Sequence, residues 1–180
     1  MNKKLIVIIN GPAGVGKDTL INEFAKTTNI SVYNYSTIGY FKEIAKKDFN
    51  WDGIKNEKGR KLLSEIKRIA VEYNDLSIEM TMEKIRHLSD VEYKNDLVMF
   101  IHIREKEETK KLMNKLKEEG YNVTSLYVHT TREIEAFNNN YSDEYAADWK
   151  KACKDYEMFL VNDDLDETVK TLSSFINIRL

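Results

Sequence analysis

Four short runs of apolar residues stand out along this chain. Each run is rich in branched side chains and shows no strict alternation of apolar and polar positions. Continuous apolar character of this kind is typical of strands that are buried on both faces of a parallel sheet. The pattern predicts strands at LIVIIN (5–10), LVMFIHI (97–103), VTSLYVHT (123–130) and YEMFLVN (156–162), with SVYNY (31–35) as a weaker fifth candidate.

Helical spacing of apolar residues fills the intervals between these runs. The predicted helices cover residues 18–28, 37–47, 57–73, 76–93, 105–119 and 143–154, and a last helix follows at DDLDETVKTLSSFINI. Strands that alternate with helices favour an α/β fold, in which a parallel sheet carries helices on both faces and the crossovers are right-handed. The exception is the range of about 36–96, which is predicted to be a helical insertion that forms a flap over the carboxyl edge of the sheet.

The composition narrows the class of protein. A chain of 180 residues is long enough for one well-packed domain with a small lid or flap, so we expect a single domain over 1–180. Charged residues make up 32% of the chain but nearly cancel, to a formal net charge of -2, which gives no electrostatic reason to expect binding to nucleic acid or to an anionic membrane. The chain has no run of about 18 apolar residues, and its single cysteine, Cys153, cannot form an internal disulfide. These features favour a reducing, cytoplasmic setting.

The segment directly after the first predicted strand reads GPAGVGKDT. Its three glycines allow a tight turn that brings several backbone N–H groups onto phosphate oxygens. A helix that begins near Lys17 adds the positive end of its dipole, and Lys17 itself supplies a mobile full charge for the outer phosphates of a nucleotide. The expected nucleotide-binding residues are Gly11, Pro12, Ala13, Gly14, Val15, Gly16, Lys17, Asp18 and Thr19.

One residue departs from the usual phosphate-binding loop. That loop reads Gly, four residues, Gly, Lys and then Ser or Thr, whereas here Asp18 follows Lys17 and Thr19 comes one place late. The usual hydroxyl touches Mg²⁺, and a carboxylate in its place would hold the metal directly or through water. We therefore expect ATP and Mg²⁺ as cofactors, with Asp18 and Thr19 as the metal-binding residues.

The run GxxxxGKDT resembles the loop of phage-type deoxynucleoside monophosphate kinases and of animal-type phosphomevalonate kinases, and adenylate kinases place the threonine in the same late position. Two further segments look similar to the deoxynucleoside monophosphate kinases: FKEIAKKDFNWDGIKNEKGRKLL and the tail CKDYEMFLVNDDLDETVKTL, which also resembles dephospho-coenzyme A kinases. The resemblance implies the three-layer fold of P-loop NTPases, with a five-stranded parallel sheet in the order 2-3-1-4-5. It also implies a nucleoside-monophosphate-binding insertion at about 36–96 and a short lid at about 131–143.

A kinase must neutralise the crowded phosphates of two anionic substrates, and arginines serve this purpose. Arg104 lies at the carboxyl end of a predicted central strand, where ligands bind in open parallel sheets. Arg132 follows the next predicted strand and begins the predicted lid, so we expect Lys17, Arg104 and Arg132 to act in catalysis. The resemblance implies that Arg60 binds the acceptor, and Arg104 and Lys42 are further candidates for that role. Basic residues such as Arg60 and Lys42 are also commonly solvated surface groups.

His102 stands where many phosphate-loop enzymes have an aspartate that holds the magnesium shell. The deoxynucleotide kinases have Asp, one residue and Arg at this place, whereas this chain has His102, Ile103 and Arg104. Either Asp18 or a carboxylate of the insertion such as Glu65 supplies the missing group, or the metal is bound through phosphates and water alone, or catalysis is lost. The sequence leaves open whether His102 impairs metal binding or catalysis.

Together these features predict a P-loop kinase that transfers a phosphoryl group from ATP to a small phosphorylated acceptor. A nucleoside or deoxynucleoside monophosphate is the leading candidate for the acceptor. Two alternatives stay open: a kinase for another small molecule, such as dephospho-coenzyme A or a phosphomevalonate-like alcohol, and a nucleotide-binding sensor that transfers no phosphoryl group. A homodimer also stays open, because the apolar surface of the insertion would either pair two chains or pack on its own domain.

Overall fold

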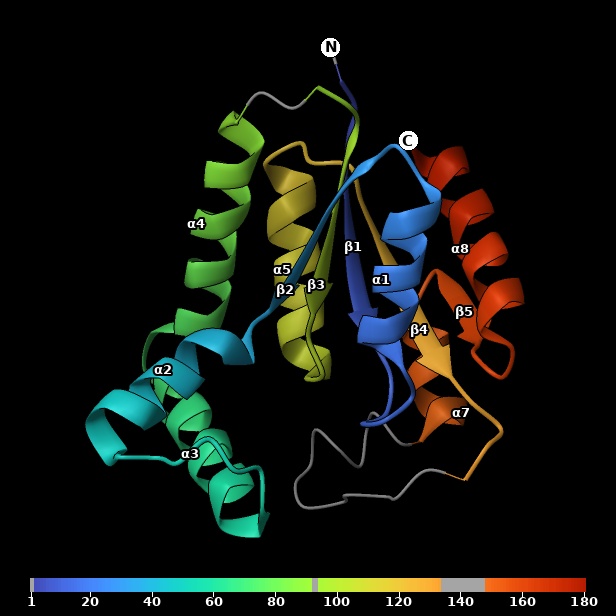
Figure 1. The fold of residues 1–180 in the computed structure, drawn as a ribbon. Coiled ribbons are helices and arrows are strands. Elements are labelled where there is room, and N and C mark those ends of the chain that lie inside the picture. The colour runs from blue at the N-terminus through green and yellow to red at the C-terminus, as the bar shows by residue number, and fades with distance from the viewer. Residues whose placement is uncertain (1, 92–93, 134–147) are drawn as a thin grey trace. The chain divides into compact units, whose positions relative to one another are not determined.

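Five strands form one parallel sheet in the order β2-β3-β1-β4-β5 (Figure 1). The strands are β1 (Lys4–Asn10), β2 (Ser31–Ser36), β3 (Leu97–His102), β4 (Val123–His129) and β5 (Met158–Val161). The structure is a computed structural model that describes residues 2–91, 94–133 and 148–180. The observed strand order confirms the predicted order 2-3-1-4-5 and the α/β class.

The first strand occupies the middle of the sheet. β1 pairs in parallel with β3 on one side and with β4 on the other, and its residues from Leu5 to Asn10 are all buried. This position accounts for its uninterrupted apolar sequence, because neither face of the strand meets water. β2 lies at an edge of the sheet and is only partly buried, which accounts for its weaker signal.

Helices cover both faces of the sheet (Figure 1). α1 (Lys17–Thr27) and α8 (Leu165–Arg179) lie together on one face, and α5 (Lys106–Glu118) lies on the other. The core under α1 and α8 contains their buried side chains and alternate residues of the strands, among them Leu5, Val7, Ile9, Leu20, Ile21, Phe24, Val98, Phe100, Leu126, Val128, Val169, Leu172 and Ile176. This core holds the carboxyl end of β1 and the start of α1 in fixed positions, and the loop that joins them carries the predicted nucleotide site.

The chain divides into two compact units. The sheet belongs to the unit of Met1–Tyr35 and Val91–Leu180, and the second unit is Ser36–Asp90. The second unit consists of α2 (Ile38–Phe49), α3 (Glu57–Asn74) and α4 (Leu76–Asp90), in which α2 contacts α3 and α3 contacts α4. It covers most of the range 36–96 that the sequence assigns to a helical insertion.

The WDG sequence forms the turn between α2 and α3. The indole N–H of Trp51 donates to the carbonyl oxygen of Ile54 at 3.1 Å. Asn56 then caps the next helix, because its side-chain oxygen accepts from the N–H of Gly59 at 2.8 Å, and α3 begins at Glu57. A Cβ at Gly59 would lie 2.3 Å from the carbonyl oxygen of Ile54, so glycine is required for this close approach.

The segment before β5 differs from its prediction. Of the helix predicted at 143–154, residues 143–147 lie outside the described residues, and the rest forms the short α7 (Trp149–Ala152) and the 3₁₀ turn η1 (Cys153–Asp155). β5 begins two residues later than predicted because the N–H of Glu157 donates to the Ser125 side-chain oxygen at 3.1 Å rather than to a strand carbonyl. Of the predicted lid at 131–143, only residues 131–133 are described.

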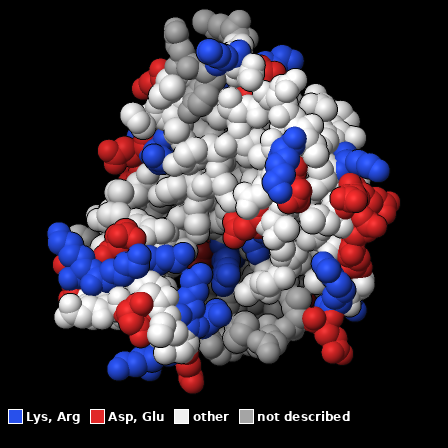
Figure 2. Space-filling model, viewed as in Figure 1, with Lys and Arg blue, Asp and Glu red and all other residues white. Residues whose placement is uncertain are grey.

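Acidic and basic side chains both occur on the face shown in Figure 2. Within the described parts of the chain, none of the helices has both the length and the apolar character needed to cross a bilayer.

Candidate phosphate-binding site

The loop between β1 and α1 depends on glycines with positive φ. The φ angles are +144° at Gly11, +80° at Gly14 and +86° at Gly16. A Cβ at Gly11 would lie 2.2 Å from the carbonyl oxygen of Val128 in β4, and one at Gly16 would lie 2.8 Å from the side-chain nitrogen of Asn162. L-residues with a side chain rarely adopt such φ values, and at Gly11 and Gly16 a Cβ would also come too close to these atoms. The glycine spacing is therefore required by the way the loop packs against β4 and the end of β5.

The start of α1 has no side-chain cap. Gly16 precedes the helix in a left-handed conformation and supplies no side-chain cap. The first N–H groups of an α-helix have no carbonyl partner within the helix, and the helix dipole makes this end positive. An anion at the start of α1 would therefore be stabilised by these N–H groups, as at other helix N-termini that bind phosphate.

Lys17 lies over the loop that it follows. Its ammonium group donates to the carbonyl oxygens of Gly11 at 2.7 Å and of Pro12 at 2.8 Å. These two contacts place a full positive charge against the backbone that would surround a phosphate group. The predicted phosphate-binding loop, Gly11 to Thr19, therefore has both a positive helix end and a cationic side chain.

Asn10, which the sequence analysis did not select, fixes the beginning of the loop. It is fully buried at the end of β1, and its side-chain oxygen accepts from the N–H of Gly11 at 2.7 Å. Its side-chain nitrogen donates to the carbonyl oxygen of Arg104 at 3.2 Å and to the hydroxyl of Tyr156 at 2.6 Å. One amide thus connects the loop to the segment after β3 and to the segment before β5. The backbone of Arg104 is thereby held beside the start of the loop, and the catalytic role of its side chain stays a prediction.

Arg132 is connected to the loop through Asn162. The guanidinium of Arg132 donates to the carbonyl oxygen of Asn162 at 2.6 Å and to the side-chain oxygen of Thr130 at 3.2 Å. The buried Asn162 in turn donates from its side-chain nitrogen to the carbonyl oxygen of Val15 at 2.8 Å. The predicted catalytic residues Lys17, Arg104 and Arg132 all belong to the sheet unit. They follow the carboxyl ends of β1, β3 and β4.

Asp163 joins the ends of β4 and β5. Its carboxylate accepts from the Thr130 hydroxyl at 2.6 Å and from the backbone N–H of Thr131 at 2.8 Å. Hydrogen bonds from the side chains of Thr130 and Thr131 lower the pKa of Asp163 to about 2. The carboxylate is therefore ionised at any physiological pH, and it holds the segment that leads into Arg132.

Asp18 is the carboxylate that the structure places at the loop. It lies in the first turn of α1 and its side chain is 79% exposed. One of its oxygens accepts from the side-chain nitrogen of Asn34 at 3.0 Å. The same oxygen lies 3.6 Å from the Nε2 atom of His102, whose side chain is 13% exposed. His102 is therefore a neighbour of Asp18 at the end of β3.

His102 is neutral at physiological pH. Burial lowers its pKa to about 4, the Asp18 carboxylate raises it in part, and the positive charges of Lys17 and Arg104 lower it further. A neutral imidazole at this place carries no charge that would oppose Mg²⁺. It is also not an acidic ligand, so the magnesium shell cannot have here the strand-end carboxylate that it has in many P-loop enzymes.

The low pKa of His102 predicts a pH-dependent stability. Between pH 6.5 and about 4 the unfolded chain binds a proton that the folded chain does not bind, so the free energy of unfolding falls as the pH falls through this window. The slope approaches about 1.4 kcal/mol per pH unit, and the contribution is fully present above pH 6.5. Urea unfolding at pH 7 and pH 5 measures it. Between these two pH values we expect the free energy of unfolding of the H102Q variant to fall by about 2 kcal/mol less than that of the wild type. An equal fall in both proteins would contradict the prediction.

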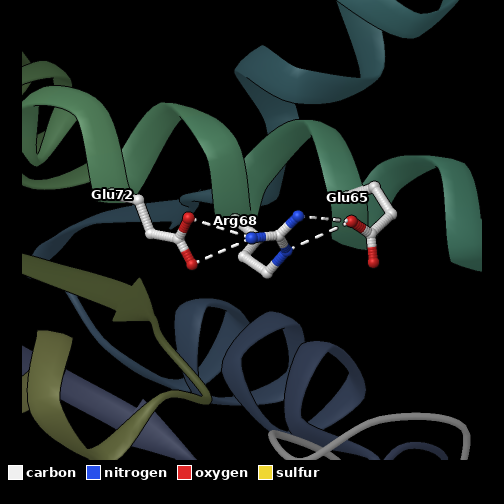
Figure 3. Close-up of polar contacts among 3 residues, drawn as sticks. All are labelled: Glu65, Arg68 and Glu72. Carbon is white, nitrogen blue, oxygen red and sulfur yellow. Dashed lines mark hydrogen bonds and ion pairs between the residues drawn. The ribbon is translucent and has the colours of Figure 1, made fainter.

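Glu65, a candidate magnesium ligand, forms an ion pair with Arg68. Figure 3 shows its carboxylate against Arg68, with the Glu65 oxygen 2.9 Å from a guanidinium nitrogen, while Glu72 binds Arg68 from the other side at 2.9 Å. All three residues lie on α3 at the spacing of one helical turn and are exposed. Glu65 is therefore paired with a cation on its own helix, whereas Asp18 is the candidate carboxylate that belongs to the loop itself.

Lys42 and Arg60 belong to the second compact unit. Lys42 lies on α2, and Arg60 lies on the first turn of α3, where its Nε–H donates to the carbonyl oxygen of Lys55 at 3.0 Å. Their assignment to the acceptor stays a prediction.

The residues at the loop fit Mg²⁺ bound together with a nucleotide. Among the described residues no three His, Cys, Asp or Glu side chains gather into a group that would hold a metal by themselves. Mg²⁺ does not need such a group, because it commonly keeps several waters and is bound by one or two carboxylates and by substrate phosphates. An exposed Asp18 carboxylate beside the loop, with the exposed Thr19 next to it, matches that donor set.

The site residues that sequence reasoning missed are all amides or carboxylates at strand ends or on an edge strand. Asn10 and Asn162 are the first polar residues after apolar strand runs, and this position was the only available signal for them. Asn162 and Asp163 also lie in the tail whose Asn-Asp pattern resembles known kinases, but the pattern alone does not indicate a role for either side chain. Asn34 had no signal, because an exposed polar residue on a weak edge strand is ordinary.

Comparison with known proteins identifies the fold. No protein-family model matches the chain, and no curated protein matches it in sequence. Among solved structures, the tunicamycin resistance protein of Deinococcus radiodurans is similar over 97% of this chain and 96% of its own, with 12% identity and a TM-score of 0.58. A protein of Chloroflexus aurantiacus that is proposed to be a kinase is similar over 100% of both chains, with 12% identity and a TM-score of 0.50. At this level of identity the likeness shows the fold alone, a five-stranded parallel sheet with helices on both faces.

Proposed function

We propose that this chain is a kinase that uses ATP and Mg²⁺ to phosphorylate a small phosphorylated acceptor, a nucleoside or deoxynucleoside monophosphate. The observation that carries the proposal is the Lys17 ammonium, which lies 2.7 and 2.8 Å from two carbonyl oxygens of a glycine loop at the start of α1. Two arginines accompany it, one after β3 and one after β4. A loop that only bound a nucleotide would have no need of arginines from two strand ends.

The proposed reaction needs charge neutralisation more than it needs a base. An oxygen of the acceptor phosphate forms the new bond to the γ-phosphorus, the bond from that phosphorus to the β,γ-bridging oxygen breaks, and ADP leaves. The acceptor oxygen is already anionic, so no side chain has to remove a proton from it. The loop N–H groups and Lys17 hold the donor phosphates, while Arg104 and Arg132 neutralise the migrating group. Mg²⁺, when bound through Asp18 and the phosphates, supplies further positive charge.

The acceptor is assigned to the second compact unit as part of this proposal. Lys42 and Arg60 are the candidate acceptor-binding residues of this unit. In this proposal the range 36–96 is an insertion within a single kinase domain. The likeness to a protein proposed to be a kinase supports phosphoryl transfer without naming the acceptor. Cytoplasmic location, the absence of nucleic-acid and membrane partners and the oligomeric state stay predictions.

A coupled assay of ADP release tests the proposal. The protein is incubated with ATP, Mg²⁺ and, in turn, each ribo- and deoxynucleoside monophosphate, dephospho-coenzyme A and phosphomevalonate. We expect turnover with at least one nucleoside monophosphate at a rate at least ten times that of ATP alone. Turnover only with one of the other acceptors would support a kinase but overturn the nucleotide acceptor. ATP binding measured by calorimetry, with no turnover on any acceptor, would favour the nucleotide sensor, for which the neutral His102 in place of an acid is the supporting observation.

A further inference from the structure

A chain of side-chain hydrogen bonds leads from the end of β3 to the start of α1. The Nε2 atom of His102 lies 2.6 Å from the side-chain oxygen of Asn34, and the side-chain nitrogen of Asn34 donates to the Oδ1 atom of Asp18 at 3.0 Å. These three residues come from β3, β2 and α1, and all of them belong to the sheet unit. Asn34 is thus a bridge between a largely buried histidine and an exposed carboxylate.

The chemistry of the three groups fixes the direction of this chain. An ionised carboxylate can only accept hydrogen bonds, so the NH₂ group of Asn34 must face Asp18. The carbonyl oxygen of Asn34 then faces His102, and because an oxygen of this kind only accepts, the Nε2 atom of His102 must carry the proton. A neutral imidazole with hydrogen on Nε2 meets this requirement. The Oδ2 atom of Asp18 has no hydrogen-bond partner among the described residues.

We propose that His102 and Asn34 are positioning residues that hold the Asp18 carboxylate as the magnesium ligand of the bound nucleotide, so that α1 supplies the carboxylate that β3 lacks. This inference rests on the proposed function only in so far as Mg²⁺ and ATP bind together at the loop. Asn34 holds one oxygen of Asp18 and leaves the other for the metal or for one of its waters. His102 orients Asn34 in turn, and its burial keeps this end of the chain fixed.

The arrangement explains why a histidine is tolerated at the end of β3. His102 pairs with Ile9, one residue before Asn10 and two before the first glycine of the loop, so it ends β3 beside the start of the loop. An exposed carboxylate on a helix would otherwise move between rotamers, and holding it in one geometry lowers the cost of binding the metal. Groups that orient a metal ligand commonly contribute ten- to a hundredfold to metal affinity.

The test measures nucleotide binding with and without the metal, so it needs no acceptor and no turnover. The dissociation constant of ATP is measured by calorimetry in Mg²⁺ and in EDTA, and the ratio of the two constants reports how strongly the protein binds the metal of the complex. We expect N34A and D18N to reduce this ratio by roughly ten- to a hundredfold, with little change in EDTA. N22A is the matched control, because Asn22 is an exposed asparagine on the same helix as Asp18, and its ratio should equal that of the wild type.

Two further variants separate positioning from packing. H102L removes the donor of the chain and is expected to reduce the ratio as N34A does, whereas H102Q offers an N–H in place of Nε2–H and is expected to restore most of it. If N34A weakens ATP binding equally in Mg²⁺ and in EDTA, or if H102L and H102Q behave alike, the proposal is overturned. Two-bond ¹H–¹⁵N spectra provide a second readout, in which His102 should show hydrogen on Nε2; hydrogen on Nδ1 would overturn the direction of the chain. A wild type that binds no ATP would instead refute the proposed function.

Discussion

Replacing Lys17 by alanine is expected to lower kcat/KM for ATP in the acceptor assay by roughly a hundred- to a thousandfold. Lys17 is the only cationic side chain between Gly11 and Thr19, and its ammonium lies against the loop backbone at 2.7 and 2.8 Å. Negative charge moves from the γ-phosphate towards the β,γ-bridging oxygen during transfer, and a positioned cation stabilises it more in the transition state than in water. The loss should therefore appear in kcat as well as in KM.

The matched control for this variant is K26A. Lys26 lies in the last turn of the same helix and makes an exposed ion pair with Glu23 at 2.6 Å, a type of contact that contributes little to stability. Its rate should stay within twofold of the wild type. A K17A protein that folds, as judged by circular dichroism, and still turns over within threefold of the wild type would show that this loop does not hold the transferred phosphoryl group.

Replacing Gly11 by alanine is expected to lower the free energy of unfolding by about 3 kcal/mol or more. The new Cβ would lie 2.2 Å from the carbonyl oxygen of Val128, a backbone atom of a buried strand, and the φ of +144° is unfavourable for alanine in any case. Gly11 directly follows Asn10, which pairs with Tyr127 of β4, so a shift of the backbone at Gly11 away from Val128 would strain this pairing. Since small domains are stable by only about 5–15 kcal/mol, a loss of this size is a large part of the total.

Gly120→Ala separates the two causes of this loss. Gly120 has a φ of +80° at the end of α5, and a Cβ there would have no atom within 4 Å, so alanine would meet backbone strain but no collision. We expect this control to cost about 1–2 kcal/mol, clearly less than Gly11→Ala. If urea unfolding shows equal losses of stability for the two variants, the collision of the new Cβ with Val128 adds nothing to the backbone strain.

The elements of the fold could be predicted because their signals are local in the sequence. A strand buried on both faces must be continuously apolar, and β1, β3 and β4 lie within one residue of their predicted bounds at each end. The loop could be predicted for the same reason, since the glycine spacing and Lys17 fall within nine consecutive residues. The strand order followed from the resemblance that these residues carry.

The connections within the site could not be predicted, because they join residues that are far apart in sequence. The Asn10 bond to Tyr156 spans 146 positions, the Asn162 bond to Val15 spans 147, and the Asn34 contact with His102 spans 68. Single asparagines have no periodicity, and which carbonyl or carboxylate they reach depends on the packing of the whole sheet.

The position of β3 between β1 and β2 also determines when the sheet can form during synthesis. β1 ends at Asn10, but its first partner strand begins at Leu97. At the usual rates of translation, the most apolar strand of the protein therefore exists for on the order of ten seconds before any strand can pair with it. Unpaired apolar strands of this kind are prone to aggregate, and parallel pairing over long separations is slow.

The two units therefore become foldable at different times. Ser36–Asp90 is one continuous segment of helices with local contacts, so its chain is complete and can fold during this interval. The loop lacks its contact with Asn162 until the ribosome has passed the end of β5. A nascent chain that stops earlier has the glycine loop in its sequence but not the shape that binds phosphate, and we expect it to depend on chaperones to keep β1 from aggregating.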